Sequence, residues 1–578
     1  MFLPILIAAS SLVADDVQFE RLSDRFINEF PALSPVSATT LGDHRFDSQV
    51  DQISPEARHQ ARSFYQRYLK ELEALDRRGL TRANQVDFAL LQHRLRGALW
   101  SLDALQEWAW NPLVYTELAG SAIYGLMARE FAPLDRRLSH VADRLEQFPR
   151  VFKQIRATLQ PARVPKVHAE TAVKQNRGVL SILRNMVDPQ RDKLSKSEAA
   201  RLVRAMETAR QAVLEHQQWL ETEMLPQATA DFRIGAKRFD EKLAFTLQTP
   251  LTRADVRQRA ESELRRVRNQ MYEISQKVYR EQYPYTRFPQ EPTDAFQQAV
   301  IRAALELAYR DIPKRGQIVE VAKKSLQQTA EFIRKQDLIT IPPDPVEIIV
   351  MPEFQRGVSL AYCDSPGPLD VGQKTFYAVA PLPEKWTDKQ VASFLREYNI
   401  RSIHDLTIHE AMPGHFVQLA HSNRYRGKLR AVLASGVFIE GWAVYTEQMM
   451  ADQGFLNHDP LMKLIALKWY LRGIANAILD QAIHTEGISR DQAMRLMMED
   501  TFQEEREAAA KWIRAQLTST QLSTYFVGYQ EHADLRQEAE REWKGDFQLK
   551  QYHDKVLSFG SPPVRYARAL LLKKPIPQ

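Results

Sequence analysis

The sequence predicts a mainly α-helical protein. Apolar residues recur every three to four positions along most of the 578 residues, which is the periodicity of amphipathic helices. One window, residues 337–379, instead combines prolines, glycines and β-branched runs in the pattern of short strands. Because the chain is longer than one typical hydrophobic core supports, we expect two lobes or one large multilayer body.

The first segment, residues 1–14, is apolar and ends just before the acidic pair Asp15-Asp16. It is too short to span a bilayer, and it is similar to the apolar part of a secretory signal peptide. The usual basic stretch is absent, because only Met1 precedes the apolar run, and the alternative is a plain buried helix. We expect a signal peptide and export to the periplasm or medium rather than a cytoplasmic location. No other stretch reaches about 18 uninterrupted apolar residues, so we expect no stable membrane insertion.

Residues 15–336 are predicted to form an N-terminal helical region. Phe19, Leu22 and Phe26 lie on one face of a first helix over residues 16–30, and a loop is expected over residues 31–54. Further helices are predicted over residues 55–78, 82–108, 134–160, 167–186, 195–225 and 252–283. Ser195 with Glu198, and Thr252 with Asp255, have the spacing of helix N-caps with an acidic first turn.

Residues 337–578 are predicted to form the catalytic, metal-binding helical region. Val346–Val350 and Thr375–Val379 are β-rich, and a Gly/Pro/Asp segment over residues 362–370 separates them. We expect a small β-ribbon beside the active site, and the second run is able to pair with an extended peptide by strand addition. Helices are expected from about residue 388 to the end.

Composition excludes several classes of function. The charged fraction is 26%, the formal net charge is +6, and acidic and basic residues are mixed without a Lys/Arg tract. We therefore expect no nucleic-acid partner. The single cysteine, Cys363, excludes an internal disulfide and a thiolate zinc site, and an inert thiol is favoured over a nucleophile because no neighbour would lower its pKa.

The residues with the clearest chemistry are His409, Glu410 and His415, with Glu440 downstream. Two imidazoles and a carboxylate leave one position of a zinc ion open for water, whose pKa the metal brings to roughly 7. A glutamate beside the first histidine is placed to take the proton of that water during attack on a carbonyl.

The spacing of the two histidines is unusual. Six residues turn a regular helix by about 240°, so His409 and His415 would point apart. Pro413 lacks an N–H and its ring would clash with the carbonyl of His409, and Gly414 frees the backbone. These two residues predict a kink that turns His415 back toward His409. The alternative is that they only end one helix and begin another.

Four segments resemble the bacterial family DUF885, a domain of unknown function that is similar to zincin-type metallopeptidases. The segments are the HExxPGHxxQ signature at His409–Gln418, the EGWAxYxE segment at Glu440–Glu447, the loop Thr40–Arg45, and Gln521–Gly528. Ser519-Thr520 replaces the usual Pro-Gly of the last segment. The resemblance implies His409, His415 and Glu440 as zinc ligands and Glu410 as general base. It also implies a large helical zincin-like (gluzincin or neurolysin-like) body with a deep cleft.

Further residues have predicted roles around this centre. Glu447 is expected either to orient a ligand histidine or to face solvent. Polar residues recur every four positions in the apolar stretch 461–483 and at its end, where they form either the wall of a wet cleft or a solvated face. In the cleft arrangement Arg472 would hold a substrate carboxylate and His484 would donate a hydrogen bond.

Tyr525 is the first candidate for stabilising an oxyanion, and Tyr529 the second; a plain core or rim tyrosine is the alternative. His404 and His421 are substitute metal ligands if the spacing of six residues fails. Together these features predict a zinc-dependent hydrolase of amide bonds in short peptides, a metallopeptidase or carboxypeptidase-like enzyme. The alternatives are a zinc hydrolase of non-peptide amides or esters, and a non-catalytic binding protein on a zincin scaffold.

Overall fold

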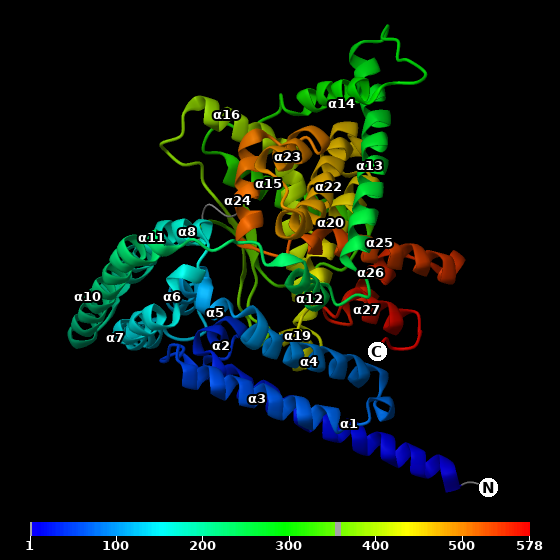
Figure 1. Cartoon of the computed structure of the whole chain (residues 1–578). Coiled ribbons are helices and arrows are strands. Elements are labelled where there is room, and N and C mark those ends of the chain that lie inside the picture. Colours follow the sequence, from blue (N-terminus) through cyan, green and yellow to red (C-terminus); the bar gives the residue numbers. More distant parts are fainter. Residues whose placement is uncertain (1–2, 353–359) are drawn as a thin grey trace.

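The protein is described here by a computed structural model that covers residues 3–352 and 360–578, with side chains from Asp15 onward. Helices dominate it and the strands form one small sheet (Figure 1), so the mainly α-helical prediction is confirmed. Among the described residues, no helix has the length and apolarity that crossing a membrane requires.

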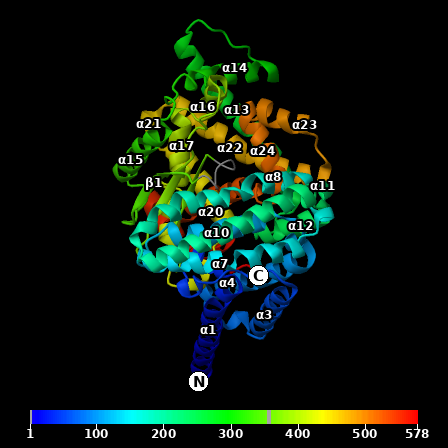
Figure 2. The ribbon, with the colours of Figure 1, turned by 90° about the vertical axis from the view of Figure 1, so that its left-hand side faces the viewer.

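The N-terminal half of the chain is built of helices α1 to α12. Their bounds are α1 Leu3–Glu29, α2 Pro35–Leu41, α3 Pro55–Glu73, α4 Arg82–Trp100, α5 Glu107–Trp110, α6 Leu113–Met127, α7 Leu134–Thr158, α8 Lys166–Asn176, α9 Gly178–Ile182, α10 Lys196–Trp219, α11 Leu225–Gln227 and α12 Gly235–Leu247. Helices α1, α3 and α4 share an aromatic core around Phe26 and Tyr68. Helices α8, α10 and α7 lie one below another on the face seen in Figure 2, and α7 and α10 share a second core with α6.

One sequence expectation in this half is wrong. Residues 35–41 were expected in a loop, but they form helix α2. The Ser34 side chain accepts a hydrogen bond from the Ser37 N–H, Pro35 occupies the first turn, and Gly42 ends the helix with φ +85°. These are ordinary start and stop signals. The capping box at Ser195 with Glu198 is present, and Thr252, predicted as an N-cap with an acidic first turn, also forms a capping box with Asp255.

Helices α13 (Arg253–Gln282), α14 (Asp294–Ala308) and α15 (Ile318–Gln336) follow. Helices α13 and α14 pack against α22 (Pro460–Gln481), and they share one core with α20 (Gly436–Asp452) and α25 (Ser523–Trp543). Residues on both sides of position 336 therefore contribute to the same hydrophobic core.

The sheet has three strands in the order β1-β3-β2. Strands β1 (Val346–Val350) and β3 (Thr375–Val379) lie where the sequence predicts them, and they pair in parallel. The third strand, β2 (Ala361–Asp364), pairs antiparallel with β3. The predicted small β element is therefore present, with a third strand in addition to the two β-rich runs that the sequence predicts. Strand addition on Thr375–Val379 is excluded, because β3 is the central strand and both its edges are paired.

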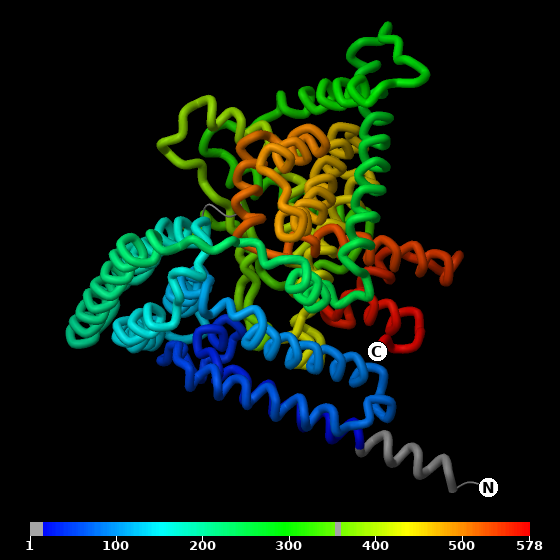
Figure 3. Tube along the Cα trace, in the orientation of Figure 1, coloured from blue at the N-terminus to red at the C-terminus, as the bar shows by residue number. Residues whose placement is uncertain are grey.

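The remaining helices form the body around the sheet. They are α16 Asp388–Glu397, α17 Ile400–Glu410, α18 His415–Ser422, α19 Lys428–Val432, α21 Phe455–His458, α23 Arg490–Arg495, α24 Glu505–Leu517, α26 Leu549–Leu557 and α27 Val564–Leu571. Helix α27 returns to α4, so the end of the chain lies against its first helices, as the trace in Figure 3 shows.

Two glycines set the distance between α20 and α25. A Cβ on Gly441 would lie 2.2 Å from the carbonyl carbon of Gly528, and a Cβ on Gly528 would lie 2.2 Å from the Val437 oxygen. Only glycine permits backbones to approach this closely. The contact places Glu440 and Tyr525 on neighbouring helices at the same level of the body.

Candidate metal centre and its pocket

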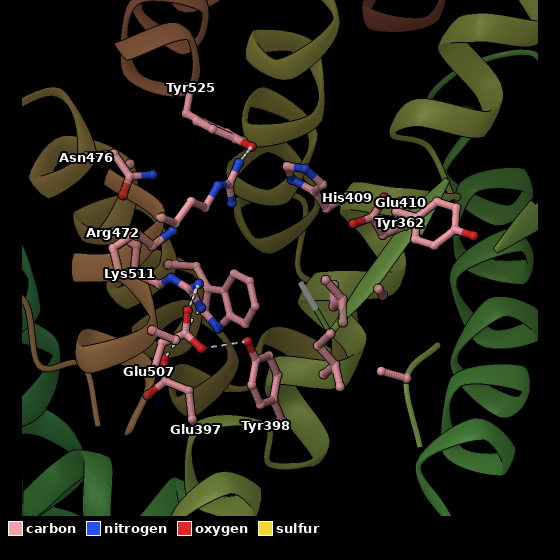
Figure 4. A pocket seen from close by; sticks show the side chains of 18 of the residues that line it. Tyr362, Glu397, Tyr398, His409, Glu410, Arg472, Asn476, Glu507, Lys511 and Tyr525 are labelled. Carbon is pink, nitrogen blue, oxygen red and sulfur yellow. Dashed lines mark hydrogen bonds and ion pairs between the residues drawn. The ribbon is translucent and has the colours of Figure 1, made fainter. Parts of the chain in front are cut away.

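A cavity of about 950 Å³ lies between strand β2 and helices α17, α20, α22, α24 and α25. His409, Glu410, His415 and Glu440 line it, and so does Tyr525. Figure 4 shows His409 and Glu410 with Tyr362 on one side and Arg472 with Lys511 on the other. The candidate catalytic residues thus border the same space.

The chain breaks where the sequence predicts. Helix α17 ends at Glu410 and α18 begins at His415. The Gly414 N–H donates to the carbonyl of Ile408 at 2.9 Å, and a Cβ on Gly414 would lie 1.9 Å from the carbonyl oxygen of His409. The Trp442 indole donates to the carbonyl of Pro413 at 3.0 Å and ties the turn to α20. Glycine at position 414 is therefore what lets α18 start directly against the end of α17.

The break brings the two histidines together. Their ring centroids are 4.7 Å apart with an interplanar angle of 85°. The Glu440 Oε2 atom lies 3.7 Å from Nε2 of His409 and 3.6 Å from Nε2 of His415. One ligand atom of each of the three residues lies within 4.8 Å of the others, and within the described chain no other such group of His, Cys, Asp or Glu occurs.

Two polar atoms of this group lack hydrogen-bond partners. Oε2 of Glu440 and Nδ1 of His415 are buried and make no hydrogen bond, which is costly unless a further group satisfies them. Burial disfavours the charged form of Glu440, but the two imidazoles beside it hold the pKa of its carboxyl below the ordinary value. An anionic oxygen facing two imidazole nitrogens is the donor set of a divalent cation site of the zinc type.

Glu447 supports the first histidine from behind. Its Oε1 atom accepts a hydrogen bond from Nδ1 of His409 at 2.6 Å, and the residue is only 2% exposed. The expectation of a solvent-facing glutamate is therefore wrong. Because Nδ1 carries the hydrogen in this contact, Nε2 of His409 is the atom left to face Glu440 and a metal.

Tyr525 also lies near His409. Its ring centroid is 6.5 Å from that of His409. The phenol oxygen accepts hydrogen bonds from Arg514 at 3.1 Å and from Gln521 at 3.4 Å, so its own hydrogen is left for a group in the cavity. Tyr529 packs on Tyr470 instead and does not line the cavity.

The predicted polar stripe on α22 is buried, so the solvated-face alternative is wrong. Lys468 is 0% exposed and donates to Glu397 at 2.7 Å. Arg472 lines the cavity, but its guanidinium is paired with Glu507 at 2.5 Å and lies 3.6 Å from Glu397. Asp480, also 0% exposed, accepts hydrogen bonds from the loop at Thr520. The sequence predicts that Arg472 binds a substrate carboxylate. In the structure its guanidinium already has two carboxylates of the protein beside it.

The structure places His484 away from the cavity. Its Nε2–H donates to the carbonyls of Ala515 and Thr518 at 3.1 and 2.7 Å, and it is not among the residues that line the pocket. The substitute ligands are also elsewhere, since His404 contacts Ser325 and His421 contacts the Thr340 carbonyl.

Sequence reasoning missed two cations of the pocket wall, Lys511 and Arg514 on α24. Their spacing of three residues puts them on one helix face, which was the available signal. Cys363 also lines the pocket, and burial together with the nearby Glu410 charge raises the pKa of its thiol. It is therefore held protonated, as an inert thiol would be.

Comparison with known proteins gives a family and two structures. Residues 35–571 match the family described as "Bacterial protein of unknown function (DUF885)". A "putative lipoprotein of unknown function" from Shewanella oneidensis is similar in structure, with a TM-score of 0.79, 33% identity, and coverage of 96% of this chain and 99% of that chain. A "putative lipoprotein" from Colwellia psychrerythraea has a TM-score of 0.77 at 18% identity, over 97% and 99%, and shows the shared fold. No curated protein matches.

Proposed function

We propose that this chain, which belongs to the DUF885 family of bacterial proteins, is a metal-dependent hydrolase that cleaves amide bonds in short peptides. The observation that carries the proposal is the convergence of His409, His415 and Glu440 within 4.8 Å beside Glu410. Two imidazole nitrogens facing a buried carboxylate oxygen that makes no hydrogen bond suit a cation. Glu410 lines the same cavity and is not one of these three donors, so it is available as a base.

The donor set favours zinc, because two imidazoles and one carboxylate with an open fourth position are the usual catalytic zinc ligands. His409 and His415 would hold the ion through Nε2, and Glu440 through its buried carboxylate oxygen. When bound, the metal would polarise the scissile carbonyl and lower the pKa of a water molecule.

The protein's own residues supply the remaining steps. Glu410 takes one proton of the attacking water as the water oxygen bonds to the carbonyl carbon, and it returns that proton to the leaving amine as the C–N bond breaks. Glu447 fixes the ring of His409 during both steps. Tyr525, whose oxygen accepts from Arg514, donates its hydroxyl hydrogen to the carbonyl oxygen as charge develops there.

The cavity favours small substrates. Its volume of about 950 Å³ falls in the range of sites that enclose most of a small ligand. A folded protein cannot present a bond inside such a space without local unfolding, whereas a short peptide can enter. Export is the location we propose, since each of the two structural relatives is described as a "putative lipoprotein" and the first residues are similar to a signal peptide.

The substitution Glu410→Gln tests the role of the base. We expect the variant to bind one equivalent of zinc, because the three ligands are intact, and to lose about 10²- to 10⁴-fold in kcat/KM, since amide cannot take a proton. Zinc is measured by elemental analysis, and turnover on a panel of short peptides, acyl amides and esters. Glu505→Gln, an exposed position on α24, is the control and should behave as the unaltered protein.

Three results would count against the proposal. Full activity in a metal-loaded Glu410→Gln variant would remove Glu410 from its role. Turnover of amides or esters without any peptide turnover would favour the non-peptide hydrolase. Zinc below about a tenth of an equivalent after chelator-free purification, with no turnover, would favour the non-catalytic binding protein, since an intact three-ligand site retains zinc tightly.

A further inference from the structure

Helix α24 presents two cations to the pocket that have no carboxylate partner. Lys511 and Arg514 are three residues apart and both line the cavity. Within the part of the chain that the structure describes, no carboxylate lies within 4.0 Å of either side chain. Arg514 donates only to the neutral groups of Gln521 and Tyr525.

The neighbouring charges are already matched. Glu397 pairs with Lys468 at 2.7 Å, Glu507 pairs with Arg472 at 2.5 Å, and Glu504 lies 3.5 Å from Arg396. The carboxylates on this wall therefore each have a cation, and none of them is left to pair with Lys511 or Arg514. The side of the pocket opposite Glu410 is thus suited to an anion.

Burying the Lys511 side chain in this position costs free energy of folding. The residue is 5% exposed, and burial together with the nearby Arg514 and Arg472 charges holds the pKa of its amine well below the usual range. A buried lysine without a counter-ion destabilises a protein unless a ligand supplies one. Such arrangements are typical of binding sites.

These cations also lie beside the reaction centre. Arg514 contacts the Tyr525 hydroxyl at 3.1 Å, and the Tyr525 ring lies 6.5 Å from the ring of the ligand His409. Lys511 is about one helical turn further along α24, toward Arg472 and Glu507. A substrate group bound by these two cations would lie a short distance along the peptide from the bond that is cleaved beside the proposed metal ligands.

We propose that Lys511 and Arg514 form a subsite for a carboxylate of the substrate, so that the enzyme selects short peptides with a free carboxylate near the cleaved bond. This rests on the hydrolase proposed above. The carboxylate would come from the peptide C-terminus or from an Asp or Glu side chain. Arg472 is left out of this subsite, because its guanidinium is already paired with Glu507 at 2.5 Å and lies 3.6 Å from Glu397.

Matched substrates test the subsite. Kinetics are compared for an acetylated tripeptide with a free C-terminal acid, the same peptide as a C-terminal amide, and an amide-capped peptide ending in Glu. We expect kcat/KM to be about 100-fold higher for the acid than for the plain amide, the size expected for a buried charge pair. High activity on the Glu-ended amide would show that the subsite accepts a side-chain carboxylate. Low activity on it would show that the subsite requires the carboxylate of the C-terminus.

The substitution Lys511→Met removes the charge and keeps the volume of the side chain. We expect the acid-to-amide ratio to fall from about 100 to below about 10, whereas Lys550→Met, an exposed control on α26, should keep the full ratio. We also expect Lys511→Met to raise the melting temperature of the ligand-free protein, because it removes a buried amine that has no carboxylate partner. A lysine with only a structural role would lower it.

Binding without turnover separates this inference from the hydrolase. The acid and amide peptides are titrated calorimetrically into the Glu410→Gln variant, with and without Lys511→Met. A preference for the acid that disappears with Lys511→Met supports the subsite even if no hydrolysis is found. Equal binding of both peptides, or a ratio that Lys511→Met leaves unchanged, would overturn the subsite while leaving the metal centre as it is.

Discussion

The hydrogen bond between Glu447 and His409 decides which nitrogen of the ring faces Glu440 and the proposed metal site. Burial raises the pKa of the Glu447 carboxyl, and the imidazole beside it acts in the opposite direction. A buried carboxylate in this contact fixes the ring and increases its basicity. The ring of His409 is thereby oriented in the metal-free protein.

Glu447→Gln keeps an acceptor at this position and removes the charge. We expect zinc affinity to fall by about 10- to 100-fold, since loss of such an outer partner has that effect at other metal sites. A competition titration with a chromophoric chelator measures it, and Glu542→Gln on the exposed part of α25 is the control. Unchanged affinity would show that Glu447 does not tune the ligand.

At the scale of single residues, motif spacing predicts the site only in part. His409, His415 and Glu440 come from one short motif and one later segment, and the Pro413-Gly414 step explained how six residues of separation still allow a shared ion. The spacing of Lys511 and Arg514 places both on one helix face, but their role depends on which carboxylates of other helices are already paired. Those pairings are long-range contacts that no local pattern encodes.

At the scale of elements, strands β1 and β3 were predictable because both are short β-branched or aromatic runs between turn residues. Strand β2 was not, since its sequence Ala-Tyr-Cys-Asp has no alternation and leads into a proline-rich segment. Pairing with β3, rather than local preference, makes it a strand. Helix α2 is a different case, because its start signal at Ser34 and its stop signal at Gly42 are both present in the local sequence.

The crossing of α20 and α25 gives a prediction at this scale. We expect Gly441→Ala to destabilise the protein by about 1–3 kcal/mol or more, because the new methyl group would overlap the backbone of Gly528. Gly436→Ala is the matched control on the same helix, since nothing lies within 4 Å of its added Cβ. It should be neutral or stabilising by about 0.5 kcal/mol.

Urea unfolding of both variants measures the difference. Because Glu440 is the residue before Gly441, the first variant is also expected to bind zinc more weakly than Gly436→Ala. Equal stability of the two variants would mean that the helices separate easily, and that glycine is not what sets the position of Glu440 beside Tyr525.

At the scale of the whole molecule, a buried arginine joins the N-terminal helices to the helices that follow residue 337. Arg430, on α19, is 1% exposed and reaches α4, where it donates to Asp87 at 2.6 Å and to the Ala83 carbonyl at 2.9 Å. It also donates to the carbonyl of Phe559 near the end of the chain at 2.9 Å. One guanidinium therefore connects three distant segments.

Removing this guanidinium should affect the stability of the entire chain. Arg430→Met leaves Asp87 buried without a partner, which we expect to cost about 3–5 kcal/mol at pH 7.5. Arg424→Met, which breaks an exposed ion pair with Asp344, should change stability by less than about 1 kcal/mol. The double variant Arg430→Met with Asp87→Asn should recover part of the loss, because the uncompensated charge is gone.

The pH dependence of this loss follows from Asp87. Burial already raises the pKa of its carboxyl, and Arg430 opposes the rise, so the folded pKa must rise further in Arg430→Met. A carboxyl with a raised folded pKa favours folding below its unfolded pKa, and this contribution disappears as pH rises through the folded value. Urea midpoints should therefore differ more between Arg430→Met and the unaltered protein at pH 7.5 than at pH 5. A difference that grows on acidification would show that the cost of the variant comes from lost packing and not from the charge of Asp87.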